Sequence, residues 1–390
     1  MLLQQVAEAL QSRRERGMLR GLRYDQGESA SGVDFSSNDY LGLARSQELE
    51  SLVSSEYSRA KAQSPVTNFG STGSRLLSGD SLYAQRVEHK LQKFFGSESA
   101  LLFNSGYDAN LSLLSSLPQP DTVVLYDELV HNSCREGLRL CRAKSVLPFK
   151  HNSASDVSKL LRSEACRGKS VVIVVESLYS MDGDVAPIQL LCDLAEQHTH
   201  DALVVVDEAH GTGVFGRGGR GLCDQQGQAS RVYCRVITFG KAVGAHGAAI
   251  VGPSMLRDYL LNYARPLIYS TSLPLHSLVC IDQAFEFMPQ VSHDRQRALL
   301  ELVELFRTLA IARNLPLAPS HSPIQAVLLP GNERVCQAAK QLQSRGFDLY
   351  PIRAPTVPSG EERIRVVLHW FNTSEQVQQL VDALHQVTLV

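Results

Sequence analysis

The sequence predicts an α/β fold: a large domain with a mostly parallel sheet (36–275), preceded by an N-terminal helical segment (1–35) and followed by a smaller α+β domain (276–390). Two observations predict this division. Short apolar runs in the middle of the chain are continuous rather than alternating, which is typical of parallel strands buried on both faces. Helical patterns separate these runs, and beyond residue 275 helices come before strands instead.

The first element is an amphipathic helix within residues 1–20, where Leu3, Val6 and Leu10 recur at helical spacing. The same segment contains two glutamates, which a mitochondrial presequence avoids, and it lacks the apolar core of a secretory signal.

The first helix that we expect in the large domain has apolar residues on one face from Tyr83 onward. Asp80 is its expected N-cap, and Gly96 is its expected end. Residues 188–198 form an expected crossover helix. The apolar runs that we expect to be strands are 100–103, 122–126, 171–175, 202–206, 236–239 and 248–251.

The C-terminal part opens with helical residues 296–313, followed by apolar strands at 324–329 and 364–368. Thr373 then begins a last helix, whose apolar residues fall on one face.

The net charge, the length of the apolar runs and the spacing of the cysteines limit the possible function classes. The net charge is -2, which gives no electrostatic reason to expect a nucleic acid or an acidic membrane as partner. No apolar run reaches the roughly 18 residues of a membrane-spanning helix. The 8 cysteines include no CxxC pair. We therefore expect reduced thiols, no metal site and a cytoplasmic protein.

Lys241 is the most informative residue, because it ends an apolar run and lies between Gly240 and Gly244. Upstream, another apolar run ends on Asp207, with His210 three residues later. An amine that forms imines and a carboxylate that can hold a pyridinium proton are the groups that pyridoxal 5'-phosphate (PLP) chemistry requires. The pair therefore predicts a PLP site at the carboxyl ends of the strands.

Other residues fit the same site. Ser105, Gly106 and Tyr107 link a strand to a helix, where backbone N–H groups can hold a phosphate. His131 follows another strand, and a flat imidazole there can stack on a cofactor ring. Glu176 and Ser180 follow the strand 171–175, again at a carboxyl end. Arg353 and Arg365 follow in the smaller domain; a guanidinium is a natural clamp for a substrate carboxylate, but the sequence pattern alone does not select these two arginines.

One motif suggests a different class of protein. The run from Asp207 to His210 matches the magnesium-binding box of DEAH-type helicases. Such a motor also requires a GxxxxGK[ST] phosphate loop. Lys169 belongs to a Gly-Lys-Ser, but Ser163 occupies the position of the first glycine, and a strand follows instead of a helix. The sequence therefore excludes a nucleic-acid motor.

Eight segments in this order resemble the α-oxoamine synthases, PLP-dependent enzymes of fold type I that condense an amino acid with an acyl-CoA and release CO₂. The segments are SNDYLGL (37–43), GSTGSRLLSG (70–79), NSGYDAN (104–110), SMDGD (180–184), DEAHGTG (207–213), TFGKAVG (238–244), YSTS (269–272) and PTVP (355–358). The resemblance implies the large PLP-dependent transferase domain of fold type I.

The resemblance also implies a role for each matched residue. Lys241 is the expected imine lysine, Asp207 the pyridinium partner and His131 the residue that stacks on the ring. His210 is expected at the phenolic oxygen, with Ser180 and Thr238 nearby. The expected phosphate ligands are Ser105, Gly106, Tyr107 and Thr271, the last from a neighbouring subunit of a homodimer. The expected substrate-binding residues are Arg20, Asn38, Arg353 and Arg365; Arg365 would hold the amino-acid carboxylate, and Arg20 the carboxylate of a pimeloyl chain.

Within this family, the region from Arg353 to the Pro-Thr-Val-Pro segment and the short N-terminus favour L-alanine and pimeloyl-CoA, or its carrier-protein thioester, as substrates in the biotin pathway. A sister activity that uses glycine or serine with another acyl-CoA remains an alternative. So does a non-catalytic relative that acts as a binding subunit, although Lys241, Asp207 and His131 are all present.

Overall fold

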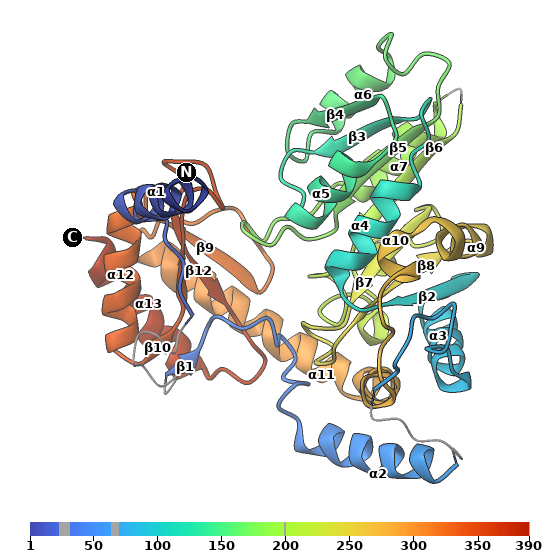
Figure 1. Ribbon diagram of the computed structural model, residues 1–390. Coiled ribbons are helices and arrows are strands. Elements are labelled where there is room, and N and C mark those ends of the chain that lie inside the picture. The colour runs from blue at the N-terminus through green and yellow to red at the C-terminus, as the bar shows by residue number, and fades with distance from the viewer. Residues whose placement is uncertain (23–31, 64–69, 199, 390) are drawn as a thin grey trace. The chain divides into compact units, whose positions relative to one another are not determined.

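The computed structural model describes residues 1–22, 32–63, 70–198 and 200–389 (Figure 1). The chain divides into two compact units, each of which is described by itself. The large unit contains Asp39–Tyr179 and Val185–Gln296, and the small unit contains Met1–Asn38, Ser180–Asp184 and Arg297–Val390. No helix within the described ranges is long and apolar enough to cross a membrane. The three-domain division expected from the sequence stays a prediction.

The large unit is built on a seven-stranded sheet of strand order β2-β8-β7-β6-β5-β3-β4. Its strands are β2 (Ser99–Phe103), β3 (Val123–Asp127), β4 (Ser145–Phe149), β5 (Val171–Glu176), β6 (Ala202–Asp207), β7 (Cys234–Thr238) and β8 (Ala248–Gly252). Strand β8 is antiparallel to both of its neighbours, and the other pairs are parallel. The mostly parallel sheet is therefore confirmed, with β4 as an additional strand.

Helices surround this sheet and complete the large unit. They are α2 (Gln47–Gln63), α3 (Leu82–Phe95), α4 (Gly106–Ser116), α5 (Asn132–Leu140), α6 (Ala154–Leu161), α7 (Ile188–Glu196), the 3₁₀ helix η2 (Arg217–Gly219), α8 (Leu222–Gln225), α9 (Ser254–Tyr263), α10 (Arg265–Ile268) and the first part of α11 (Leu275–Ala312). The N-cap of α3 is Ser81 rather than the expected Asp80, because the Ser81 hydroxyl accepts the N–H of Ala84. Gly96 ends the helix at a φ of 62°.

The continuous apolar strands pack on both faces of the sheet. Val172 and Val174 of β5 lie in a core cluster with residues of α4 and α5. Val171 and Ile173 lie in a second cluster with residues of α6 and α7. Consecutive strand residues point to opposite faces, so a strand covered on both sides must be apolar throughout.

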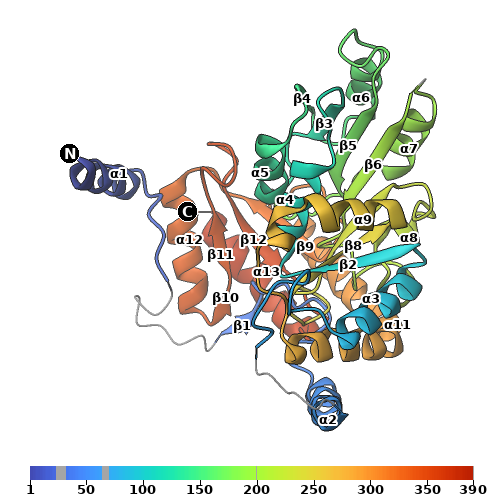
Figure 2. The ribbon, with the colours of Figure 1, turned by 45° about the vertical axis from the view of Figure 1, so that its right-hand side comes forward.

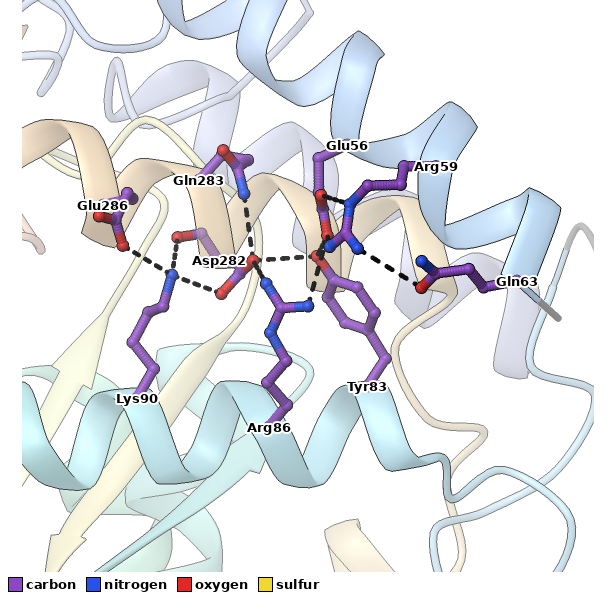
Figure 3. A network of polar contacts seen from close by, with 9 residues as sticks. All are labelled: Glu56, Arg59, Gln63, Tyr83, Arg86, Lys90, Asp282, Gln283 and Glu286. Carbon is purple, nitrogen blue, oxygen red and sulfur yellow. Dashed lines mark hydrogen bonds and ion pairs between the residues drawn. The ribbon is translucent and has the colours of Figure 1, made fainter.

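A polar network holds α2, α3 and α11 together (Figure 3). The fully buried carboxylate of Asp282 on α11 pairs with Lys90 Nζ at 2.7 Å and with Arg86 Nη2 at 2.9 Å. Tyr83 Oη contacts both Asp282 and Glu56 of α2, at 3.0 and 2.9 Å. Because Asp282 is surrounded by donors, its buried charge is compensated.

The small unit contains a three-stranded antiparallel sheet of order β11-β12-β9 and a separate parallel pair, β1-β10. Figure 2 shows α12 and α13 beside these strands. The strands are β1 (Val33–Asp34), β9 (Ile324–Leu328), β10 (Phe347–Asp348), β11 (Tyr350–Ile352) and β12 (Arg363–Val367), and the helices are α1 (Leu2–Glu15), α12 (Asn332–Ser344) and α13 (Ser374–Thr388). Thr373 caps α13, as expected. In β1-β10, Val33 pairs with Phe347.

Candidate active site

The expected site residues of the large unit follow strands that end at one edge of its sheet. Strands β5, β6 and β7 are parallel, and Glu176 pairs with Asp207 at their carboxyl ends. Phe103 pairs with Ala248, which in turn pairs with Thr238. The loop that follows Phe103 therefore starts at the same edge, where ligands bind in open α/β sheets.

Lys241 begins a hydrogen-bonded series at this edge. Its Nζ lies 2.7 Å from His210 Nε2, and His210 Nδ1 lies 2.6 Å from the hydroxyl of Tyr40. Tyr40 is fully buried and His210 is 4% exposed. A charged lysine only donates, so His210 Nε2 must accept from Lys241 in that state, while its Nδ1–H donates to Tyr40.

Asp207 is held as a hydrogen-bond acceptor. Its Oδ2 accepts from Asn110 Nδ2 at 2.7 Å, and its Oδ1 accepts from the N–H of Ala209 at 2.8 Å. Asn110 comes from α4, and its Nδ2 also donates to Ser133 Oγ at 3.0 Å. Both carboxylate oxygens of Asp207 therefore accept a hydrogen bond from a neighbouring N–H group.

His131 is fixed at both its backbone and its ring. It is the N-cap of α5, and its Nδ1 accepts the N–H of Ser133 at 3.2 Å. Its own N–H donates to Glu176 Oε1 at 2.6 Å. Burial lowers the pKa of His131; the charge of Asp207 opposes this, and the charge of Lys241 reinforces it. With Nδ1 as acceptor, the neutral ring carries its proton on Nε2.

The residues expected to hold phosphate surround the start of α4. Ser105 is the N-cap: its hydroxyl accepts the N–H of Asp108 at 3.1 Å and donates to Asp108 Oδ2 at 2.9 Å. The first N–H groups of a helix have no partner within it. Gly106 faces Thr238 so closely that a Cβ would lie within 3.0 Å of Thr238 Cγ2. Thr238 Oγ1 is buried and has no hydrogen-bond partner among the described residues.

Tyr107 and Thr271 lie on the outer side of this turn. Tyr107 is 42% exposed. Thr271 is also exposed, and its carbonyl oxygen accepts from Asn104 Nδ2 at 2.8 Å. The segment after Thr271 is fastened further, because Ser272 Oγ donates to the carbonyl of Gly79 at 2.6 Å.

Asn38, Ser180 and Arg365 come together in the small unit. Arg365 Nε donates to the carbonyl of Ser180 at 2.7 Å, and Arg365 Nη2 donates to Asn38 Oδ1 at 3.0 Å. These two bonds fix the plane of the guanidinium. The structure therefore places Ser180 with Arg365, in a unit other than that of His210.

Arg20 and Arg353 meet at a pocket of the small unit. Arg20 Nη2 donates to Thr356 Oγ1 at 3.3 Å, and Arg353 Nη2 donates to the carbonyl of Leu19 at 2.8 Å. Arg353 also donates to the carbonyl of Gly17. The residues that line the pocket are Met18, Arg20, Pro351, Ile352, Arg353, Ala354, Pro355 and Thr356.

Three residues of the site had no assigned role in the sequence prediction: Tyr40, Asn110 and Glu176. Tyr40 and Asn110 lie within the segments SNDYLGL and NSGYDAN, so the resemblance marked their positions but not their partners. Glu176 ends a strand beside Asp207, and only the strand register reveals this. The sequence places Glu176 at the carboxyl end of the strand 171–175, but it identifies no partner for this residue.

Comparison with known proteins identifies the family. The model for aminotransferase class I and II matches residues 30–384. The 8-amino-7-oxononanoate synthase of Emericella nidulans is 38% identical over 379 residues, which cover 91% of this chain and 89% of that protein. A solved structure of SPT (serine palmitoyltransferase) with PLP superposes on this chain with a TM-score of 0.83 at 27% identity, covering 91% of this chain and 87% of that one. The 8-amino-7-oxononanoate synthase of Francisella tularensis has a TM-score of 0.76 at 26% identity, covering 92% and 98%.

The residues present fit PLP. The orphaned hydroxyl of Thr238 and the space that a Cβ on Gly106 would fill suit the phosphate. The buried carboxylate of Asp207 suits a protonated pyridine nitrogen, and Lys241 supplies the amine. The chain is thus a PLP-dependent acyltransferase with the fold-type I architecture, and it belongs to the aminotransferase class I and II family.

Proposed function

We propose that this enzyme condenses L-alanine with a pimeloyl thioester, either the CoA or the carrier-protein form, to give 8-amino-7-oxononanoate, the free thiol and CO₂. The similarity to the Emericella nidulans synthase, 38% identity over 91% of this chain, carries the choice of substrates. The arrangement of Lys241, His210 and Asp207 supports the chemistry.

Lys241 is the residue that holds PLP and moves the proton. Its amine would bind the cofactor, be released by the amino group of L-alanine and then take the α-proton of the substrate. When bound, PLP supplies an electron sink for the carbon that loses this proton. A proton transferred by a positioned side chain contributes typically about 10²–10⁴-fold to the rate. His210, 2.7 Å from Nζ, would orient the amine and exchange protons with it.

Asp207 and His131 would act on the cofactor ring. Asp207 would accept the N–H of the protonated pyridine nitrogen, and its hydrogen bonds from Asn110 and Ala209 hold the carboxylate in position for this. His131 would pack on the ring in its neutral form and present its Nε2–H as a hydrogen-bond donor. Ser133 fixes that tautomer by donating its N–H to Nδ1.

The arginines of the small unit would recognise the carboxylates of the two substrates. Arg365, fixed by Asn38 and Ser180, would bind the carboxylate of L-alanine. Arg20 and Arg353, at one pocket, would bind the far carboxylate of the pimeloyl chain. A monocarboxylic acyl chain has no group for this second pair, so the pocket would discriminate between thioesters.

Thiol release tests the proposal when it is measured with all combinations of L-alanine, glycine or L-serine and pimeloyl-CoA, acetyl-CoA or palmitoyl-CoA. We expect the highest kcat/KM with L-alanine and pimeloyl-CoA, and 8-amino-7-oxononanoate by mass spectrometry. A preference for another pair would keep the chemistry and refute the substrates. Arg20→Ala should raise KM for pimeloyl-CoA and leave KM for L-alanine unchanged.

Serine palmitoyl transfer is the second candidate, favoured by the TM-score of 0.83 to a Sphingomonas wittichii serine palmitoyltransferase at 28% identity. The assay above distinguishes it, because that activity requires L-serine and palmitoyl-CoA.

We also propose that the enzyme is a homodimer, in which Thr271 serves the phosphate of the neighbouring subunit. Large apolar side chains near Thr271 and at the start of α3 are exposed in the single chain: Leu77 and Leu82, both 84%, and Tyr269, 78%. Apolar groups of this size favour burial in an interface. Light scattering should give twice the chain mass of 42.9 kDa. An active monomer would contradict the shared site.

A further inference from the structure

Glu176 is a buried acid that the mechanism above does not use. It is 3% exposed, at the carboxyl end of β5, and its Oε1 accepts the N–H of His131 at 2.6 Å. This bond fixes the backbone of His131 where α5 begins, while Ser133 fixes the ring. Removal of Glu176 would leave the His131 N–H without that acceptor.

Glu176 also lies beside Asp207. The two residues pair in register on neighbouring parallel strands, and such partners project their side chains to the same face of the sheet. Two carboxyl groups that share a buried site do not both ionise readily. Both carboxylate oxygens of Asp207 already accept hydrogen bonds, from Asn110 and Ala209, so we expect the shared proton on Glu176.

The charged and titratable groups around Glu176 support a proton on Glu176 and a negative charge on Asp207. Burial and the charge of Asp207 raise the pKa of Glu176 to about 8, with Asp127 acting in the same direction, while Lys241 and the His131 N–H oppose it. The groups that influence Glu176, or are influenced by it, are Asp127 on β3, His131 and Cys134 at α5, Tyr179 after β5, Asp207 on β6 and Lys241 after β7.

We propose that Glu176 is a positioning residue that holds His131 in place by accepting its backbone N–H and, by keeping its own proton, leaves Asp207 as the charged carboxylate of the pair. The inference rests on the roles proposed above for His131 and Asp207 toward PLP. When Glu176 loses its proton, a second negative charge enters the site and favours protonation of the His131 ring. The neutral, stacking form of His131 then becomes less favoured.

The first test uses the apoprotein, so that it does not depend on the substrates. The ring signals of the 12 histidines are followed by NMR between pH 5 and 10, and His131 is assigned with a His131→Gln variant. We expect the His131 signal to show an inflection at about pH 8 in the wild type. Glu176→Gln should abolish this inflection. Glu208→Gln, a matched change at another fully buried glutamate, should keep it.

The second test separates positioning from simple structural support. The amide oxygen that Glu176→Gln introduces can still accept the His131 N–H, so this variant should keep kcat within about twofold at pH 7. Glu176→Ala should lower kcat about 10- to 100-fold, as expected when a catalytic group is misplaced. An inflection that persists in Glu176→Gln, or is absent from the wild type, would overturn the proposal. Equal loss of kcat in both variants would overturn it too.

Discussion

A single methyl group added at Gly106 should weaken PLP binding. The Cβ of Gly106→Ala would overlap Thr238 Cγ2, whereas ordinary contacts begin at 3.4 Å, so one of the two segments must move by about 1 Å. Overpacking of this kind costs about 1–3 kcal/mol. If the whole cost falls on the phosphate site, PLP affinity drops about 5- to 150-fold.

The same geometry provides a rescue. Thr238→Ser removes Cγ2 and keeps the buried hydroxyl, and the next atom that the new Cβ would meet is the Cβ of residue 238, at 3.3 Å. The double variant, Gly106→Ala with Thr238→Ser, should therefore recover most of the affinity. The assay is a titration of apoprotein with PLP, followed by the absorbance of the bound cofactor. Melting of the apoprotein serves as the control for folding.

Two results would refute the reasoning: wild-type affinity in Gly106→Ala, or a double variant no better than the single one. In the first case, the Gly106 turn would not adjoin the phosphate. In the second, the clash with Thr238 would not be the cause of the loss.

Four further outcomes are expected. Lys241→Ala should lower kcat by at least about 10²–10⁴-fold and remove the visible absorbance of bound PLP, as measured by steady-state kinetics and spectroscopy. Tyr40→Phe removes the 2.6 Å bond to His210 and should reduce the free energy of unfolding by about 1–3 kcal/mol in urea titrations, since a buried ring nitrogen loses its partner. Arg365→Lys should raise KM for L-alanine about tenfold and leave KM for the thioester unchanged, because a lysine cannot reproduce the planar fork. Burial raises the pKa of Glu176 to about 8, so the folded state keeps a proton that the unfolded chain releases near pH 4.5. Stability should fall as pH rises between these values, and melting temperatures should show Glu176→Gln gaining on the wild type from pH 5 to 9.

The sequence predicts the core of the large unit well, because strands buried on both faces are continuously apolar. It does not predict β4, where only Phe149 is buried and Pro148 is exposed, as suits an edge strand. It also places the cap of α3 at Asp80, whose carboxylate instead pairs with Arg75 at 2.8 Å. Two neighbouring residues with similar capping ability cannot be ranked without their tertiary partners.

In the candidate active site too, the sequence predicts some residues and not their partners. Asp207, His210 and Lys241 can be placed at one edge of the sheet because each follows an apolar strand. The partners of these residues cannot be predicted from local sequence, because the contact between Tyr40 and His210 joins residues that are 170 positions apart. The contact of Glu176 with His131 likewise depends on which strands are neighbours, and local sequence does not encode that order.

The pairing of β1 with β10 has a consequence for how the protein is made. Val33 emerges from the ribosome more than 300 residues before its partner Phe347. At synthesis rates of about 5–20 residues per second, the first strand waits roughly 15–60 s for the second. During that interval, the N-terminal segment has no native sheet partner, while all seven strands of the large unit are synthesised. The small unit is therefore begun first and finished last: its N-terminal segment is made before the large unit, and its C-terminal segment after it.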